Sequence, residues 1–125
     1  MRKKLLIMET KHTPGPWLVH DSYDEDQKII VWDGDEQAHK PICDMGEIGD
    51  MNYADELANA KLIAAAPDLL EALKATIFEL LELKAYYLRE ADSFEGDEKK
   101  MYLMNASATD SKLIKAEAAI KKATE

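Results

Sequence analysis

Pro67 interrupts a long stretch rich in alanine and leucine, and it constrains the fold of the second half of the chain more than any other residue. Proline has no backbone N–H and disfavours helical geometry in the residue before it, which is Ala66. It is well tolerated in the first turn of a helix, where its N–H would have no partner. We therefore expect one helix to end near Ala66 and a second to begin at Pro67.

The first of these helices is expected to begin at Asn52. An asparagine side chain at a helix start accepts a hydrogen bond from a free backbone N–H, here near Asp55. The carboxylates of Asp55 and Glu56 suit the positive end of the helix dipole. Apolar residues then recur at spacings of three and four, as in a helix with one buried face: they are Ala54, Leu57, Ala58, Leu62 and Ala65.

Two further helical regions follow Pro67. The first has a leucine-rich side and is expected to run to about Asp92, with residues 93–96 closing it. The second covers residues 97–123, and the sequence leaves open whether it is one helix or is broken near Thr109, because residues of low helix propensity gather there. These residues are Asn105, Ser107, Thr109, Asp110 and Ser111.

The first half of the chain has the pattern of a small β-sheet. Residues 13–49 contain seven of the nine glycine and proline residues. Three runs rich in β-branched and aromatic residues, 17–21, 28–32 and 41–45, are separated by acidic or glycine-containing turns at 24–27 and 33–36. We predict a three-stranded antiparallel meander whose middle strand presents Ile29 and Val31 on one face, and Ile30 and Trp32 on the other.

Together these elements predict an α+β protein, with the N-terminal meander packed against two or three C-terminal helices. A chain of 125 residues has the usual length of one domain. We expect residues 12–125 to form that domain, with the meander in 12–50 and the helices in 51–125. Residues 1–11 are expected to be a poorly ordered leader, because their apolar run is too short for a signal peptide.

Charge and cysteine content narrow the classes of partner. The formal net charge is −9, with 25 acidic and 16 basic residues, so duplex nucleic acid is not an expected partner. No apolar run approaches the ~20 residues of a membrane span, so a membrane is not an expected partner either. The single cysteine, Cys43, rules out a disulfide within one chain, which fits a reducing cytoplasm. It is expected to be a small buried apolar residue.

Catalytic and metal-binding patterns are absent from the sequence. The histidines His12, His20 and His39 lack the spacing of metal-ligand motifs, and no cofactor motif occurs. Asp21 could orient the imidazole of His20, but no nucleophile is paired with them and Ser22 lacks the strained turn of an activated serine. We predict no catalytic residue, no metal and no cofactor. A small hydrolase using His20 is the enzymatic alternative.

Four residues are candidates for ligand binding. Trp17 follows a stiff Pro-Gly-Pro run. Its side chain either packs in the hydrophobic core or provides a surface on which a base stacks. His20 is the second candidate. Asn59 and Lys61 interrupt an otherwise apolar segment, where a polar amide bonds either a strand or a ligand. Alanines at 58, 60 and 64–66 would let another element approach closely, either a third helix of the same chain or a second copy in a homo-oligomer.

Three blocks of the sequence resemble a family of small proteins encoded by bacteriophages and prophages. They are residues 12–17 (HTPGPW), residues 58–73 (ANAKLIAAAPDLLEAL) and residues 116–123 (AEAAIKKA). The resemblance supplies no catalytic residues. It implies an accessory protein of a phage, acting in the cytoplasm of the bacterial host.

The functional expectation combines that resemblance with the missing catalytic motifs. We expect a non-enzymatic binding protein that counteracts host defence or regulation by binding a host protein. The alternative partner is a small nucleotide signalling ligand, which an oligomer of the protein would sequester.

Overall fold

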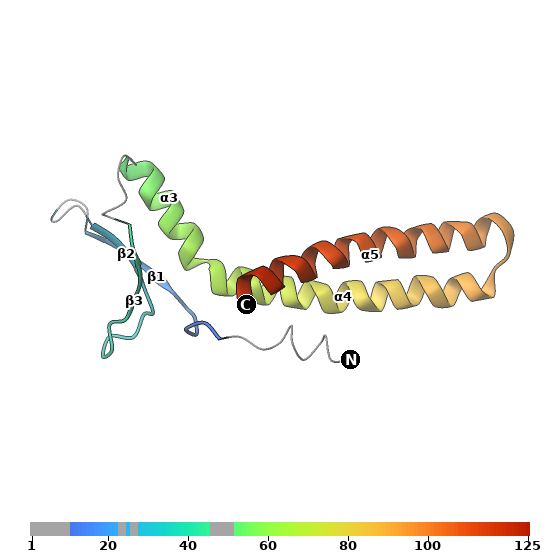
Figure 1. Cartoon of the computed structure of the whole chain (residues 1–125), viewed down its shortest axis with the longest axis horizontal. Helices are drawn as coiled ribbons and strands as arrows, with labels where there is room; N and C mark the ends of the chain where they lie inside the picture. The colour runs from blue at the N-terminus through green and yellow to red at the C-terminus, as the bar shows by residue number, and fades with distance from the viewer. Residues whose placement is uncertain (1–10, 23–24, 26–27, 46–51) are drawn as a thin grey trace. The chain divides into compact units, whose positions relative to one another are not determined.

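The computed structural model describes residues 11–22, 25, 28–45 and 52–125, with three strands followed by three helices (Figure 1). The predicted α+β class is confirmed. Three sequence predictions fall on residues outside the described ones: residues 1–10 of the expected leader at 1–11, most of the turn at 24–27, and the boundary at residues 50–51. The chain divides into two compact units, one of residues 12–70 and one containing residues 71–125. That residues 12–125 act as one domain stays a prediction.

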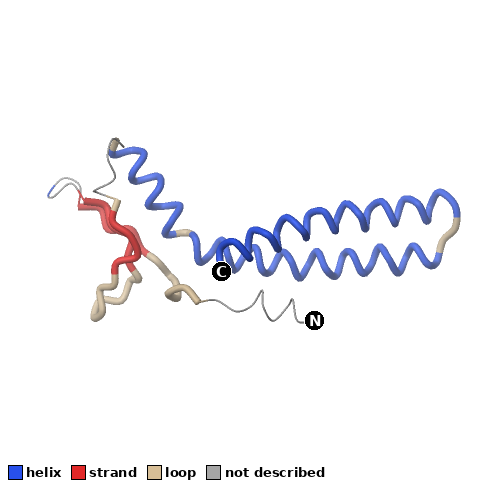
Figure 2. The backbone as a smooth tube through the Cα atoms, viewed as in Figure 1, coloured by secondary structure: helices blue, strands red, loops and turns tan. Residues whose placement is uncertain are grey.

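The strands form the predicted three-stranded antiparallel sheet, in the order β1-β2-β3. Figure 2 shows them in red. They are β1 (Leu18–Ser22), β2 (Lys28–Trp32) and β3 (Pro41–Asp44). The register pairs Val19 with Val31 and Val31 with Cys43, and it shifts between Val31 and Trp32. Because side chains alternate along a strand, this register fixes which residues share a face of the sheet.

One face of the sheet packs against helix α3 (Tyr53–Ala64). The core cluster consists of Ile29 and Val31 from β2, both fully buried, with Met45 after β3 and Ala60 from α3. Tyr53 at the start of α3 donates a hydrogen bond of 2.5 Å from its hydroxyl to Asp21 Oδ2 on β1. The small side chain of Ala60 lets α3 lie close to the sheet and cover Ile29 and Val31 of β2.

The two helices meet at Pro67 as predicted. Asn52 caps α3, since its side-chain Oδ1 accepts a hydrogen bond of 2.9 Å from the backbone N–H of Asp55. Helix α4 (Ala66–Ser93) begins one residue before the buried Pro67. Gly15 lies against this proline, so closely that a Cβ added to it would come within 2.8 Å of Pro67 Cβ. Glycine is required there because the approach leaves no room for a side chain.

Residues 71–125 form a helical hairpin in which α4 is followed by α5 (Gly96–Thr124), running antiparallel beside it (Figure 1). The ion pair between Lys84 Nζ and Asp110 Oδ1, at 2.7 Å, joins the two helices. No helix in the described ranges has both the length and the apolar content that crossing a membrane requires. Buried side chains come from both helices: Lys74, Ile77, Ala91, Ala106, Thr109, Leu113 and Ile120.

Helix α5 is not broken near Thr109, because it is continuous from Gly96 to Thr124. The Thr109 hydroxyl donates to the carbonyl of Asn105 at 2.8 Å, and the Ser111 hydroxyl donates to the carbonyl of Ser107 at 3.3 Å. Hydroxyls that would compete with the helix in an isolated peptide are therefore satisfied by the helix itself. Thr109 is also 5 % exposed, so packing in the hairpin offsets its low helix propensity.

Candidate functional site

The outer face of the sheet, opposite α3, carries a shallow hollow of about 410 Å³. Its described lining comes from all three strands and from the loop between β2 and β3: His20, Ile30, Trp32, His39 and Pro41. The strand register accounts for this grouping, since His20 pairs with Ile30, and Trp32 pairs with Pro41. The hollow has the volume of a small-ligand pocket and a mainly apolar and aromatic lining.

The His39 ring forms one wall of the hollow by stacking on Trp32. Their ring centroids lie 5.4 Å apart, and the ring planes are inclined by only 15°. His39 has a positive φ of 48°, a left-handed backbone conformation that a side chain with a Cβ disfavours. Strained backbone of this kind persists only where its surroundings hold it, and it is concentrated at functional sites.

The loop of residues 33–40 holds His39 in that conformation through Asp35. The Asp35 carboxylate accepts hydrogen bonds from the backbone N–H groups of Gln37 at 2.9 Å and Ala38 at 3.2 Å. The Asp35 backbone carbonyl accepts from the N–H of His39 at 2.8 Å. The bonds from Gln37 and Ala38 hold the pKa of the Asp35 carboxyl below its ordinary value of 3.8, since they favour the charged form.

The loop that contributes His39 to the hollow is acidic. It contains the carboxylates of Asp33, Asp35 and Glu36 against one ammonium group, that of Lys40. An acidic loop that borders an apolar hollow favours a ligand that combines an apolar group with positive charge.

The five lining residues offer apolar and aromatic surfaces and two imidazole rings. None of them carries a hydroxyl, thiol or carboxylate nucleophile. His20 and Asp21 are neighbours on β1, so their side chains point to opposite faces of the sheet, and Asp21 accepts from Tyr53. Among the described residues, no three His, Cys, Asp or Glu side chains come together as a metal site.

The four predicted binding residues are not gathered in one place. His20 lines the hollow, whereas Trp17 packs against the core cluster on the other side of the sheet and donates from Nε1 to the Thr13 carbonyl at 3.1 Å. Asn59 is half-buried in α3, and Lys61 is exposed in its last turn. Binding roles for Trp17, Asn59 and Lys61 stay predictions.

Trp32, His39 and Pro41 belong to the hollow but were not among the predicted binding residues. Part of the signal was available, because alternation along residues 28–32 already put Ile30 and Trp32 on one face. Pairing that strand with residues 17–21 would have added His20. The position of His39 follows from the loop conformation, which the sequence pattern does not reveal.

The chain was compared with protein families, curated proteins and solved structures. A family model described as Salmonella phage P22 protein Y8K6 matches residues 8–125, nearly the whole chain. No curated protein and no solved structure matches the chain.

Proposed function

Since the chain belongs to the family of Salmonella phage P22 protein Y8K6, we propose that it is a non-enzymatic accessory protein of a bacteriophage, which binds a host protein in the bacterial cytoplasm. Its role in this proposal is to counteract host defence or host regulation. The observation that carries the proposal is the aromatic hollow around Trp32, with the strained His39 as one wall.

The chemistry of the hollow indicates what the host protein presents. A hollow of about 410 Å³ accommodates one or two apolar or aromatic side chains rather than a folded surface. The acidic loop of residues 33–40 adds a preference for basic residues next to that side chain. The proposed partner therefore offers an apolar or aromatic side chain flanked by lysine or arginine.

A comparison of two alanine variants tests this proposal. The wild type, Trp32→Ala and Leu62→Ala are used to capture proteins from a lysate of host cells, at low and at raised salt. Leu62 is the control because it is an apolar side chain, 63 % exposed, on α3 rather than on the outer face of the sheet. We expect the wild type and Leu62→Ala to retain one host protein, with retention falling at raised salt, and Trp32→Ala to lose it. Equal capture by all three, or capture of none, contradicts the proposal.

The second candidate function is sequestration of a small nucleotide. The stacked rings of Trp32 and His39 favour it, because an aromatic face also stacks on a planar base. The acidic loop opposes it, because phosphate is repelled by carboxylates. A thermal-shift screen with linear and cyclic nucleotides decides between the two: a ligand in hundredfold excess over its Kd stabilises the protein by about 2.7 kcal/mol. A flat screen removes this candidate.

A further inference from the structure

Beside the face that packs on α5, helix α4 carries a second stripe of mostly apolar residues. The stripe follows the spacing of three and four residues that characterises a coiled-coil seam, and its members are Leu73, Thr76, Leu80, Leu83 and Tyr87. Leu83 is 39 % exposed and the other three large side chains are half-buried. Ile77 is buried in the hairpin and Lys84 pairs with Asp110 of α5, and the ring of Tyr87 also reaches α5, since its centroid lies 6.5 Å from that of Tyr102. Helix α4 therefore carries apolar side chains, such as Leu83, beyond the face that packs on α5.

Helix α5 carries a matching exposed stripe with the same spacing. Its members, all exposed, are Met101, Asn105, Ala108, Lys112, Lys115 and Ala119. The alanines allow another helix to approach closely, and the aliphatic stems of the two lysines can cover leucine side chains while their charges stay in water.

The two stripes lie on the same side of the hairpin. On α4, Thr76 and Leu83 each precede a residue that faces α5, namely Ile77 and Lys84. The α5 stripe is offset in the same direction, since Ala108 immediately precedes the buried Thr109. A residue lies about 100° around a helix from its neighbour, so in two antiparallel helices equal offsets fall on one flank. We call this surface the hairpin flank.

The charges of the two helices determine which occupant fits the hairpin flank. Helix α4 carries six acidic and three basic residues, whereas α5 carries four acidic and six basic residues. A second hairpin laid with its α4 on this α5 brings opposite charges together on both sides of the interface. Laying α4 on α4 would instead set the lysines of the two α5 helices against each other.

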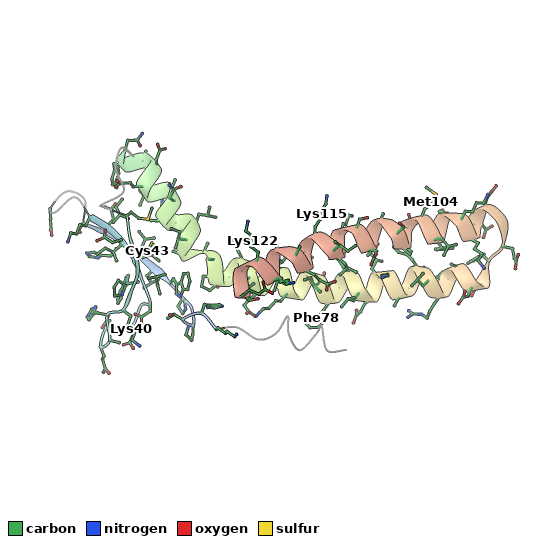
Figure 3. All side chains as sticks on the ribbon, in the orientation of Figure 1. Lys40, Cys43, Phe78, Met104, Lys115 and Lys122 are labelled. Carbon is green, nitrogen blue, oxygen red and sulfur yellow. The ribbon has the colours of Figure 1, made fainter. Side chains whose placement is uncertain are left out.

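The register of the hairpin makes this complementarity specific. Glu79 lies five residues before Lys84, and Lys115 lies five residues after Asp110, so both stand at the same level from the ion pair. Lys115 projects from α5 away from α4 (Figure 3). Within the described residues, neither Glu79 nor Lys115 has an ion-pair partner.

We propose that two copies of the protein pair through the hairpin flank to form an antiparallel four-helix bundle. Helix α4 of each copy lies on α5 of the other, and Glu79 faces Lys115 of the partner subunit. The apolar stripe of α4 then becomes buried, as in bundles built from two hairpins. This assembly is independent of host-protein binding by the outer face of the sheet.

Sedimentation equilibrium of the full chain tests the assembly. We expect a mass twice the 14.1 kDa of one chain, and a shift to the monomer for Leu83→Glu. Ile114→Glu is the matched control: Ile114 is 62 % exposed but immediately follows the buried Leu113, on the opposite flank of α5. Far-UV circular dichroism checks that both variants stay helical. A wild type that is monomeric up to millimolar concentration, or a dimer that Leu83→Glu leaves intact, overturns the proposal.

A charge exchange tests the arrangement of the helices. Glu79→Lys and Lys115→Glu are each expected to raise the dimer Kd about tenfold, because symmetry places two like-charged contacts in every dimer. The double variant restores both attractions and is expected to return the Kd to that of the wild type. Additive losses in the double variant overturn the pairing of α4 with α5.

Discussion

His39 is the residue at which backbone conformation and candidate function meet. Its φ of 48° would suit glycine or asparagine better, but neither could supply a ring to stack on Trp32. The loop therefore has a strained backbone at the position whose side chain stacks on Trp32. Asp35 makes this possible, because its carboxylate satisfies the backbone N–H groups that precede His39.

The wall formed by His39 is therefore expected to depend on Asp35. In Asp35→Ala the loop loses two hydrogen bonds, so the nuclear Overhauser contacts between the rings of His39 and Trp32 should weaken or vanish. Asp35→Asn is the control, because its amide oxygen can still accept from Gln37 and Ala38. Strong ring contacts in Asp35→Ala would show that another group holds His39.

The same site predicts a sensitivity to acid. The pKa of the Asp35 carboxyl is lower in the folded protein than its ordinary value of 3.8. The stabilisation that the charged carboxylate gives to the folded protein is therefore fully present above pH 3.8. The contribution is lost as the pH falls through the lower folded value, because the protonated carboxyl is a weaker acceptor. We expect the contacts between His39 and Trp32 to decline in that acid range in the wild type, and to stay constant there in Asp35→Asn.

At the scale of elements, the joint between α3 and α4 packs against a segment that is distant in sequence, the one that contains Gly15. Pro67 starts the second helix and also provides the surface on which Gly15 lies. Both residues belong to the unit of residues 12–70. The proline thus acts as a helix signal in the sequence and as a packing surface in the structure.

This contact predicts that Gly15→Ala destabilises the protein by about 1–3 kcal/mol, the usual range for overpacking. The added Cβ would lie 2.8 Å from Pro67 Cβ and 3.2 Å from its Cγ, so the backbone must shift. Chemical denaturation measures the loss. In the background of Pro67→Gly, which removes both atoms, the same substitution should cost less. An equal cost in both backgrounds would assign the effect to the loop rather than to the contact.

The elements were predicted well because their signals are local. The cap at Asn52, the joint at Pro67 and the alternation in residues 28–32 each act within one or two turns of the chain. The continuity of α5 could not be decided from the sequence, because it depends on the burial of Thr109, which is a property of the hairpin. The hollow was only partly foreseen, because it requires strand pairing and the left-handed His39 together.

At the scale of the whole molecule, helix α4 belongs to both compact units. It begins at Ala66, whereas the boundary between the units falls after Leu70. One helix therefore contributes to the unit that holds the sheet and to the hairpin.

This sharing predicts cooperative unfolding of the two units. Both tryptophans lie in residues 12–70, so their fluorescence reports on that unit, whereas circular dichroism at 222 nm is dominated by α4 and α5. Leu113 is buried in the hairpin, so Leu113→Ala should lower the free energy of unfolding by about 2–5 kcal/mol. The unfolding midpoints followed by fluorescence and by circular dichroism should then shift equally. If only circular dichroism shifts, the units unfold separately and residues 12–125 are not one cooperative domain.

The alternation of side chains along β2 has a consequence for how such a protein changes over time. Ile29 and Val31 are fully buried against α3, whereas Ile30 and Trp32 line the outer hollow. Mutation can therefore alter every second residue of the strand without disturbing the core. Under the binding role proposed above, a phage lineage that meets a new host could change the outer hollow at those positions and keep the core of the protein.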